Sequence, residues 1–296
     1  MTINSWPART AEVGSILDIV LTGVARSGTT LACRLLNTLP HVVALHEPMP
    51  LGLWSESGDG DAAVDQLQGF FSAQRRCVLQ SGKALSLASS EGIIPDNSFS
   101  NRINSRGKRS VSVSLQEVTI DKVLEEDFSL VLKHPAAFVA LLPLLVQRWP
   151  CFALVRNPLA VLMSWNSIDM KVQDGRIPLA EAFNPPLRRM LNDASSAMER
   201  QLIALDFFFA QISTFIPNEQ VIPYERLIAT QGAALEIVTP TAGPIRASLK
   251  ERNANMLYDR KLAWPMAKML LAVGGAWSSF YSPEEVERLA ERIQIS

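Results

Sequence analysis

The most informative stretch of the chain is Asp18-Ile-Val-Leu-Thr-Gly23-Val-Ala-Arg-Ser-Gly28-Thr-Thr30, in which an apolar run leads into a loop bracketed by two glycines. The run predicts a buried strand over 18–22. Leucines that recur at helical spacing from Leu31 to Leu39 predict a helix directly after the loop. Because the glycines permit a tight turn, the loop amides and the helix N-terminus would form an anion cradle. A turn that only caps the helix is the simpler alternative.

The loop follows the G-x-x-x-x-G-K-[ST] spacing of nucleotide-binding loops, except that Thr29 stands where the lysine is expected. An ATPase or kinase uses that lysine on the β- and γ-phosphates, with Mg²⁺ held by the next hydroxyl and by an aspartate after another strand. Here the next predicted strands lead into Lys133 and Arg156, not into an aspartate. Together with Arg26, these side chains would neutralise an anion without a metal.

Three further apolar runs, at Ser129–Leu132, Cys151–Val155 and, more weakly, Gln220–Pro223, also predict strands. Each is followed by a helical pattern, and helices are expected over 136–148, 159–170, 187–215 and from Ser282-Pro283 onward. Strands that are apolar throughout are typical of a parallel sheet covered by helices on both faces. The sequence therefore predicts an α/β fold and a single domain over 1–296. The one shift in composition, toward Ser, Gly, Asp and Asn at about 55–110, predicts an insertion or lid.

Charge and cysteine content exclude several classes of function. The 296 residues hold 28 Lys and Arg against 29 Asp and Glu, so the chain lacks the positive field of a nucleic-acid-binding protein. The longest apolar stretch, 130–150, is interrupted by charged residues and prolines, so no membrane span is expected. The 3 cysteines are widely spaced, which favours a reducing, cytoplasmic compartment.

A second group of candidate residues lies outside the loop. Glu47 follows a short extended segment and would act as a general base, or equally be a solvated turn residue. Arg156 ends a predicted strand and Ser164 lies about two turns along the next helix, so the two would flank one ligand group unless Arg156 is only a surface ion-pair partner. Lys133 and His134 are adjacent in an extended segment and should point to opposite faces. This favours Glu47 over His134 as the base.

In order and spacing, these elements resemble the sulfotransferases that use 3′-phosphoadenosine 5′-phosphosulfate (PAPS). Arg26-Ser27-Gly28-Thr29-Thr30 matches the loop that binds the 5′-phosphosulfate, in the arginine-bearing form of the tyrosylprotein and carbohydrate sulfotransferases. The resemblance covers about a third of the chain. It implies a P-loop, nucleotide-kinase-like fold of three layers.

The resemblance also implies roles for single residues. Arg156 and Ser164 match the element that binds the 3′-phosphate, and Tyr224 begins a Tyr-Glu-x-Leu segment that lies near the adenine in the family. Glu47 stands at the offset of the catalytic glutamate, and Lys133 resembles the lysine that stabilises the sulfonate in transit. Arg26 would share that stabilising role.

The function that the resemblance implies is transfer of a sulfonate from PAPS to a hydroxyl, less readily an amine, with release of adenosine 3′,5′-bisphosphate and no metal. The acceptor would be a small molecule or a glycan, not a nucleic acid. A Mg²⁺-dependent P-loop kinase and a non-catalytic nucleotide-binding protein are the alternatives. The cytosolic members carry a C-terminal Arg-Lys-Gly element, and the nearest string here, Arg106-Gly-Lys-Arg109, lies mid-chain, so that role is not transferred. The basic stretch 75–109 is more simply a solvated lid than a site for an anionic acceptor.

Overall fold

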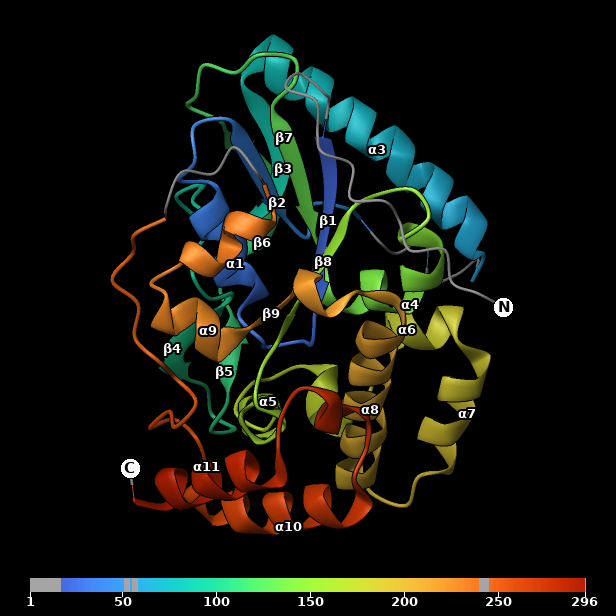
Figure 1. Cartoon of the computed structure of the whole chain (residues 1–296), viewed down its shortest axis with the longest axis vertical. Helices are drawn as coiled ribbons and strands as arrows, with labels where there is room; N and C mark the ends of the chain where they lie inside the picture. Colours follow the sequence, from blue (N-terminus) through green and yellow to red (C-terminus); the bar gives the residue numbers. More distant parts are fainter. Residues whose placement is uncertain (1–16, 51–53, 55–57, 240–244, 296) are drawn as a thin grey trace.

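The computed structural model describes residues 17–50, 54, 58–239 and 245–295. Its centre is a five-stranded sheet in the order β2-β7-β1-β8-β9 (Figure 1). The strands are β1 (Leu17–Gly23), β2 (Val42–His46), β7 (Ser129–Lys133), β8 (Cys151–Val155) and β9 (Val221–Pro223). All four neighbouring pairs are parallel. The predicted α/β class and the four predicted strands are confirmed, and β2 is the extended segment before Glu47.

Two hydrophobic cores, one on each face of the sheet, explain why the middle of each strand is apolar on both sides. On β1, Val20 packs into one core, whereas its neighbours Ile19 and Leu21 pack into the other. On β8, Ala153 packs into the same core as Val20, and Leu154 packs into the core of Ile19 and Leu21. Because successive side chains of a strand point to opposite faces, a sheet buried on both faces favours apolar residues at successive positions, and buried polar residues such as His46 and Lys133 stand at the carboxyl ends of its strands.

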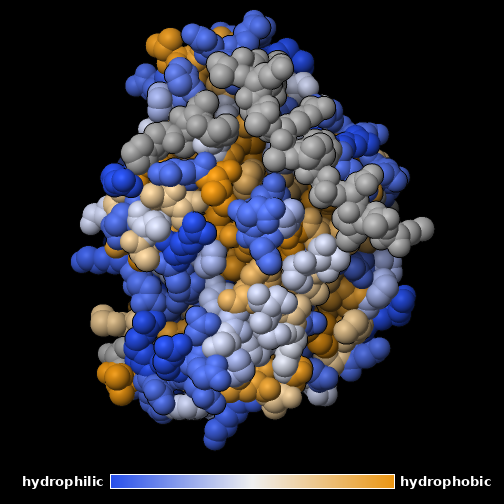
Figure 2. Space-filling view, in the orientation of Figure 1, coloured by the Kyte–Doolittle hydropathy of each residue, from blue (hydrophilic) through white to orange (hydrophobic). Residues whose placement is uncertain are grey.

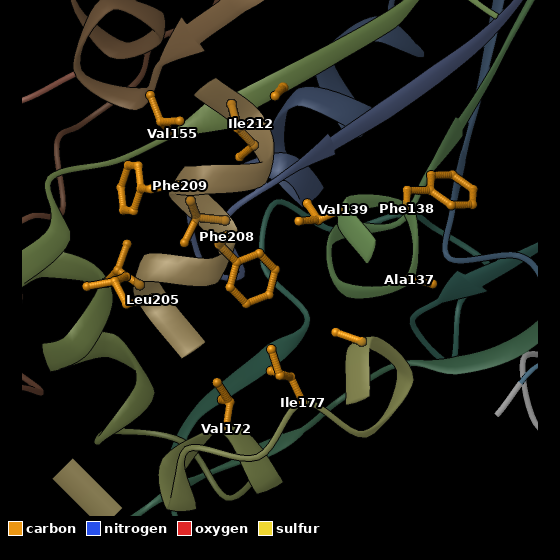
Figure 3. Packing of buried hydrophobic residues seen from close by; sticks show 14 of the residues in the cluster. Ala137, Phe138, Val139, Val155, Val172, Ile177, Leu205, Phe208, Phe209 and Ile212 are labelled. Carbon is orange, nitrogen blue, oxygen red and sulfur yellow. The ribbon is translucent and has the colours of Figure 1, made fainter. Parts of the chain in front are cut away.

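Helices from distant parts of the chain cover the two faces. The smaller core lies under α1 (Thr29–Leu36), α9 (Tyr224–Ala229) and the short helix η3 (Ala233–Ile237). The larger core contains side chains from most of the remaining helices, and Figure 3 shows part of it around Phe208 and Phe209. These helices are α3 (Gly60–Ser81), α4 (Pro135–Leu145), α5 (Pro158–Trp165), α6 (Pro178–Phe183), α7 (Pro185–Asp193), α8 (Ala197–Phe215), α10 (Ala263–Val273) and α11 (Pro283–Ile295).

The stretch expected to form a lid contains regular structure that its composition did not reveal. Most of its first part is the 22-residue helix α3, whose Leu67 and Phe71 are fully buried in the larger core. Two antiparallel strand pairs follow: β3 (Lys83–Ala88) with β6 (Ser114–Thr119) and, between them in the sequence, the hairpin of β4 (Phe99–Ile103) and β5 (Arg109–Val111). Two of the basic residues in this stretch, Arg75 and Arg109, are buried, so it is not simply a solvated basic surface.

Several of the helices expected from the sequence have different bounds, and α4 ends at Leu145 instead of at 148. The helix expected over 187–215 is divided into α7 and α8. Ser196 accepts a hydrogen bond from the Glu199 amide while the Glu199 carboxylate accepts one from the Ser195 amide, a capping arrangement that starts a new helix. The helix expected over 159–170 ends at Trp165, because Asn166 and Ser167 close it with turn hydrogen bonds. The final helix begins at Pro283 with Ser282 as its cap, as predicted.

The strand order determines where a site forms. From β1 the chain adds β2 and β7 on one side, and then β8 and β9 on the other. The loop after β1 therefore lies where the order reverses, and in such sheets ligands bind outside the carboxyl ends of the strands at this point. None of the helices in the described ranges has the length and apolarity to cross a membrane. The face in Figure 2 is largely hydrophilic, with apolar side chains showing between the polar areas.

Gly23 lies where the loop after β1 comes closest to β8, so a substitution here tests how tightly the two are packed. It has a φ of 147°, and a Cβ at this position would lie 2.2 Å from the Leu154 carbonyl oxygen of β8. We expect Gly23→Ala to lower the free energy of unfolding by about 3 kcal/mol or more, because backbone must move. Gly107 has a φ of 72° and open space around it, so Gly107→Ala should cost only about 1 kcal/mol. Urea denaturation measures both, and equal losses would contradict the close packing of Gly23.

Candidate functional site

A cavity of about 660 Å³ opens at the carboxyl ends of β1, β2, β7 and β8. Its charged lining is strongly unbalanced. Among the described residues the carboxylates are Glu47 and Asp96. The cationic side chains that line it are Arg26, Arg109, Lys133, Arg156, Lys171, Arg176, Lys250 and Arg252. An excess of cationic side chains around a cavity is the electrostatic condition for binding an anion.

The loop after β1 has the geometry of an anion cradle. Its Val24 amide and Ser27 hydroxyl both donate to the Leu154 carbonyl, which holds the loop against β8. Arg26 and Gly28 have positive φ angles, 77° and 93°. Gly28 is the N-cap of α1, and no side chain of the described residues caps this helix. The first amides of α1 therefore remain available to an anion.

Arg26 projects from this loop toward the hairpin and α5. Its Nε donates to Ser164 Oγ at 3.2 Å and its second guanidinium nitrogen donates to Asn97 Oδ1 at 2.8 Å. The guanidinium also lies 4.5 Å from the centre of the Phe99 ring. Burial and then the charge of Arg109 lower the pKa of Arg26 to about 9, so the group keeps its charge at neutral pH. The structure thus brings Arg26 and Ser164 into direct contact.

Arg156 lies under the same loop, at the end of β8. It donates to the Arg26 carbonyl at 3.0 Å, to Asn253 Oδ1 at 2.7 Å and to the Arg252 carbonyl at 2.7 Å. The ring of Tyr224 lies 4.6 Å from its guanidinium. Tyr224 also packs against Gly28, where a Cβ would lie 2.9 Å from the ring. Arg156, Ser164 and Tyr224 therefore surround the loop, and Arg156 ties the loop to the C-terminal part of the chain.

Glu47 follows β2 and lies at the end of the neighbouring strand β7. It has a φ of 45°, and its Oε1 lies 2.6 Å from Lys133 Nζ, with the amine almost fully buried. Burial acts to raise the pKa of Glu47, but the neighbouring Lys133 and two histidines outweigh it and hold that pKa well below its usual range. Glu47 is therefore ionised at neutral pH.

The expectation that Lys133 and His134 point away from one site is wrong. His134 Nε2 lies 3.9 Å from Glu47 Oε2, while Lys133 contacts Oε1, so the carboxylate extends between the two side chains. The strand ends at Lys133, and Glu47 reaches over its end from the neighbouring strand, held by its amide on the Lys133 carbonyl. His134 is the N-cap of α4, and its Nδ1 accepts from the Ala137 amide. In the neutral ring the proton therefore lies on Nε2.

His46 and Ser98 belong to the site but were not identified from the sequence. Lys133 Nζ lies 3.2 Å from His46 Nδ1, and His46 Nε2 lies 2.8 Å from Ser98 Oγ. Because an ammonium can only donate, His46 accepts at Nδ1 and donates from Nε2 to Ser98. Thr30 Oγ1 of the loop lies 3.4 Å from both Ser98 Oγ and Lys133 Nζ. This buried network holds Lys133 at the mouth of the loop.

Arg109 also reaches the cavity, although the sequence placed it only in a basic stretch. Its guanidinium donates to Ser167 Oγ at 2.7 Å, and its backbone pairs with the segment after α5. Among the described residues, its buried Nε has no hydrogen-bond partner. Burial lowers the pKa of Arg109, and the charges of Arg156 and Arg252 lower it further. No group of three His, Cys, Asp or Glu side chains within the described ranges has the arrangement of a metal site.

Known proteins give little further information. No family model matches the chain, and no curated protein matches it. The solved structures that match include the sulfotransferase domain of the olefin synthase of Synechococcus PCC 7002. The two chains are 14% identical over 97% of each, with a TM-score of 0.35. A likeness of this degree carries no conclusion about activity.

The buried histidines make stability depend on pH. Burial lowers the pKa of His134 to about 4 from 6.5, so between these values the unfolded chain binds a proton that the folded chain does not. Stability should therefore fall as pH decreases from 6.5, and by pH 5 this one group would cost about 2 kcal/mol. His134→Asn keeps a capping side chain and should reduce the loss between pH 7 and pH 5 by about that amount.

Denaturant titrations at the two pH values measure this difference. His41→Asn, at an exposed histidine, is the matched control and should follow the wild-type protein. If the His134→Asn protein loses as much stability as the wild type, His134 is not held neutral in the folded chain.

Proposed function

We propose that the protein transfers a sulfonate from PAPS to a hydroxyl group of an acceptor and releases adenosine 3′,5′-bisphosphate. The observation that carries the proposal is the uncapped loop at the end of β1, with Arg26, Lys133 and Arg156 around it and Glu47 as the carboxylate that faces Lys133. Such a site favours a ligand with several negative charges. The order and spacing of the same residues in the sequence favour PAPS.

The loop and its cations would bind the donor. Backbone amides from Gly28 to Thr30 at the start of α1 would hold the 5′-phosphate, as helix N-termini do in other phosphate sites, whereas the Ser27 amide already donates to the Val24 carbonyl. Arg156 would meet the 3′-phosphate with Ser164 beside it, and Tyr224 would lie near the adenine. Arg156 now donates to Tyr258 Oη at 3.3 Å, the longest of its hydrogen bonds, and this donor is the one most readily transferred to a phosphate.

Glu47 and Lys133 would carry out the transfer. The acceptor oxygen attacks sulfur, the bond between sulfur and the phosphate oxygen breaks, and Glu47 takes the hydroxyl proton. Lys133 and Arg26 would stabilise the negative charge on the sulfonate and on the leaving phosphate. When Lys133 turns from Glu47 to the sulfonate, the strongest of the charges that hold the pKa of Glu47 low is removed. Donor binding would thereby make Glu47 a stronger base.

The contacts of His134 support Glu47 as the base. The Nδ1 lone pair of His134 accepts from the Ala137 amide, and Nε2 of the neutral ring already holds a proton. His134 could accept a proton only by losing its cap on α4. Its place beside Glu47 Oε2 suits a donor that orients the carboxylate.

A Mg²⁺-dependent kinase is the second candidate, because Thr30 occupies the position of the Walker hydroxyl and lies 3.4 Å from Lys133 Nζ. A kinase would transfer phosphate from ATP and stop when EDTA removes Mg²⁺. A sulfotransferase of the proposed type would use PAPS and remain active in EDTA. Incubation with each donor, with and without EDTA, separates the two reactions.

Glu47→Gln tests the role of the base. General-base catalysis contributes about 10²–10⁴ to a rate, so we expect a loss of this size in kcat with little change in bisphosphate affinity. Asp96→Asn is the matched control, since Asp96 also lines the cavity but is exposed, 3.8 Å from Arg252. It should retain most of the activity. A loss of less than threefold in Glu47→Gln would remove Glu47 from this role.

A further inference from the structure

One side of the cavity is apolar, and the donor site described above does not use it. Phe99 of β4 and Val113 after β5 line this side. The segment from the end of α5 into α6 adds Ile168, Val172, Ile177 and Leu179, and the six side chains together are called the apolar wall. These six side chains carry no hydrogen-bonding atoms, and the surface of the cavity as a whole is mostly apolar.

This apolar wall is part of the packed core. Ile168, Val172 and Ile177 are at most 7% exposed and belong to the larger core, while Leu179 packs against it. Val172 and Ile177 are labelled in Figure 3, together with Phe208 of the same core. The wall is therefore a preformed surface, and a bound molecule would meet it without rearrangement of the chain.

The apolar wall is continuous with the site around Glu47. Phe99 contacts the Arg26 guanidinium on one side, and α4, which begins next to His134, contacts α6. Ala136 in the first turn of α4 also lines the cavity. A molecule whose hydroxyl lies beside Glu47 would therefore place its apolar part against this wall.

Two of the charged groups near this wall are engaged or exposed, and a third, Arg109, donates to Ser167 and keeps only its Nε without a partner among the described residues. Arg176 pairs with Glu181 and donates to Asn192, and Lys171 is exposed. A sugar placed against the six apolar side chains would leave its hydroxyls without partners, which disfavours its binding. An alkyl chain in the same place would gain the full benefit of leaving water.

We propose that the acceptor is an aliphatic alcohol, with its hydroxyl at Glu47 and its hydrocarbon part between Phe99 and Leu179. This rests on the proposed function, since it names the substrate class of the same site. The reaction forms a bond between the alcohol oxygen and sulfur, breaks the bond between sulfur and the phosphate oxygen, and passes the hydroxyl proton to Glu47. The product is an alkyl sulfate.

Calorimetric titration with a series from 1-butanol to 1-octanol, in the presence of saturating adenosine 3′,5′-bisphosphate, tests the proposal. Affinity should rise about two- to fourfold with each methylene, because each is buried against the apolar wall. Glucose should not bind detectably. Leu179→Asn should weaken 1-octanol at least fivefold. Leu115→Asn, at an exposed leucine of β6 outside the cavity, is the matched control and should bind like the wild-type protein.

Turnover with PAPS completes the test, with mass spectrometry to detect octyl sulfate. Octyl sulfate from 1-octanol, and no sulfated glucose, is the expected result. Affinity independent of chain length, or faster sulfation of glucose than of 1-octanol, would overturn the aliphatic acceptor while leaving sulfonate transfer in place. Failure of the bisphosphate itself to bind would instead overturn the proposed function, and the aliphatic acceptor with it.

Discussion

Arg26, Arg109, Arg156 and Lys133 bring four positive charges to the same edge of the sheet, and Glu47 faces the lysine. Like charges in a buried site repel one another, so the structure compensates them with neutral partners, among them the Arg26 and Arg252 carbonyls and the rings of Phe99 and Tyr224. The compensation is incomplete, because the Nε of Arg109 has no hydrogen-bond partner among the described residues. An anion of high charge would complete it, and this constraint determines which ligands the site favours.

The C-terminal part of the chain holds this arrangement in place. Glu225 of α9 accepts hydrogen bonds from the Asn157 amide, from Asn253 Nδ2 and from the hydroxyl of Tyr281. Asn253 in turn accepts from Arg156, which donates to the carbonyl of Arg26 in the loop. The position of the loop after β1 thus depends on residues more than 200 positions later in the sequence. These groups form one hydrogen-bond network, so removal of one member leaves the others without a partner.

The central sheet and the loop could be predicted because their signals are local. Apolar runs and the spacing of Gly23 and Gly28 depend only on neighbours in the sequence. The break at Ser196 also had a local signal, the Ser-x-x-Glu cap, which the apolar periodicity of the flanking helices obscured. Arg109 and Ser98 could not be predicted, because a hairpin far from the loop in sequence carries them to the cavity. The place of His134 depends on how Glu47 extends from a neighbouring strand, which alternation along one strand does not describe.

We propose above all that the site recognises a nucleotide with phosphates on both the 5′ and the 3′ positions. Calorimetric titration of the wild-type protein with adenosine 3′,5′-bisphosphate and with AMP in one buffer tests it most directly. A hydrogen bond to a charged group contributes about 1.5–3 kcal/mol, so the bisphosphate should bind at least about tenfold more tightly than AMP. Equal affinity for the two nucleotides, or tighter binding of ATP with Mg²⁺ than of the bisphosphate, would contradict the account.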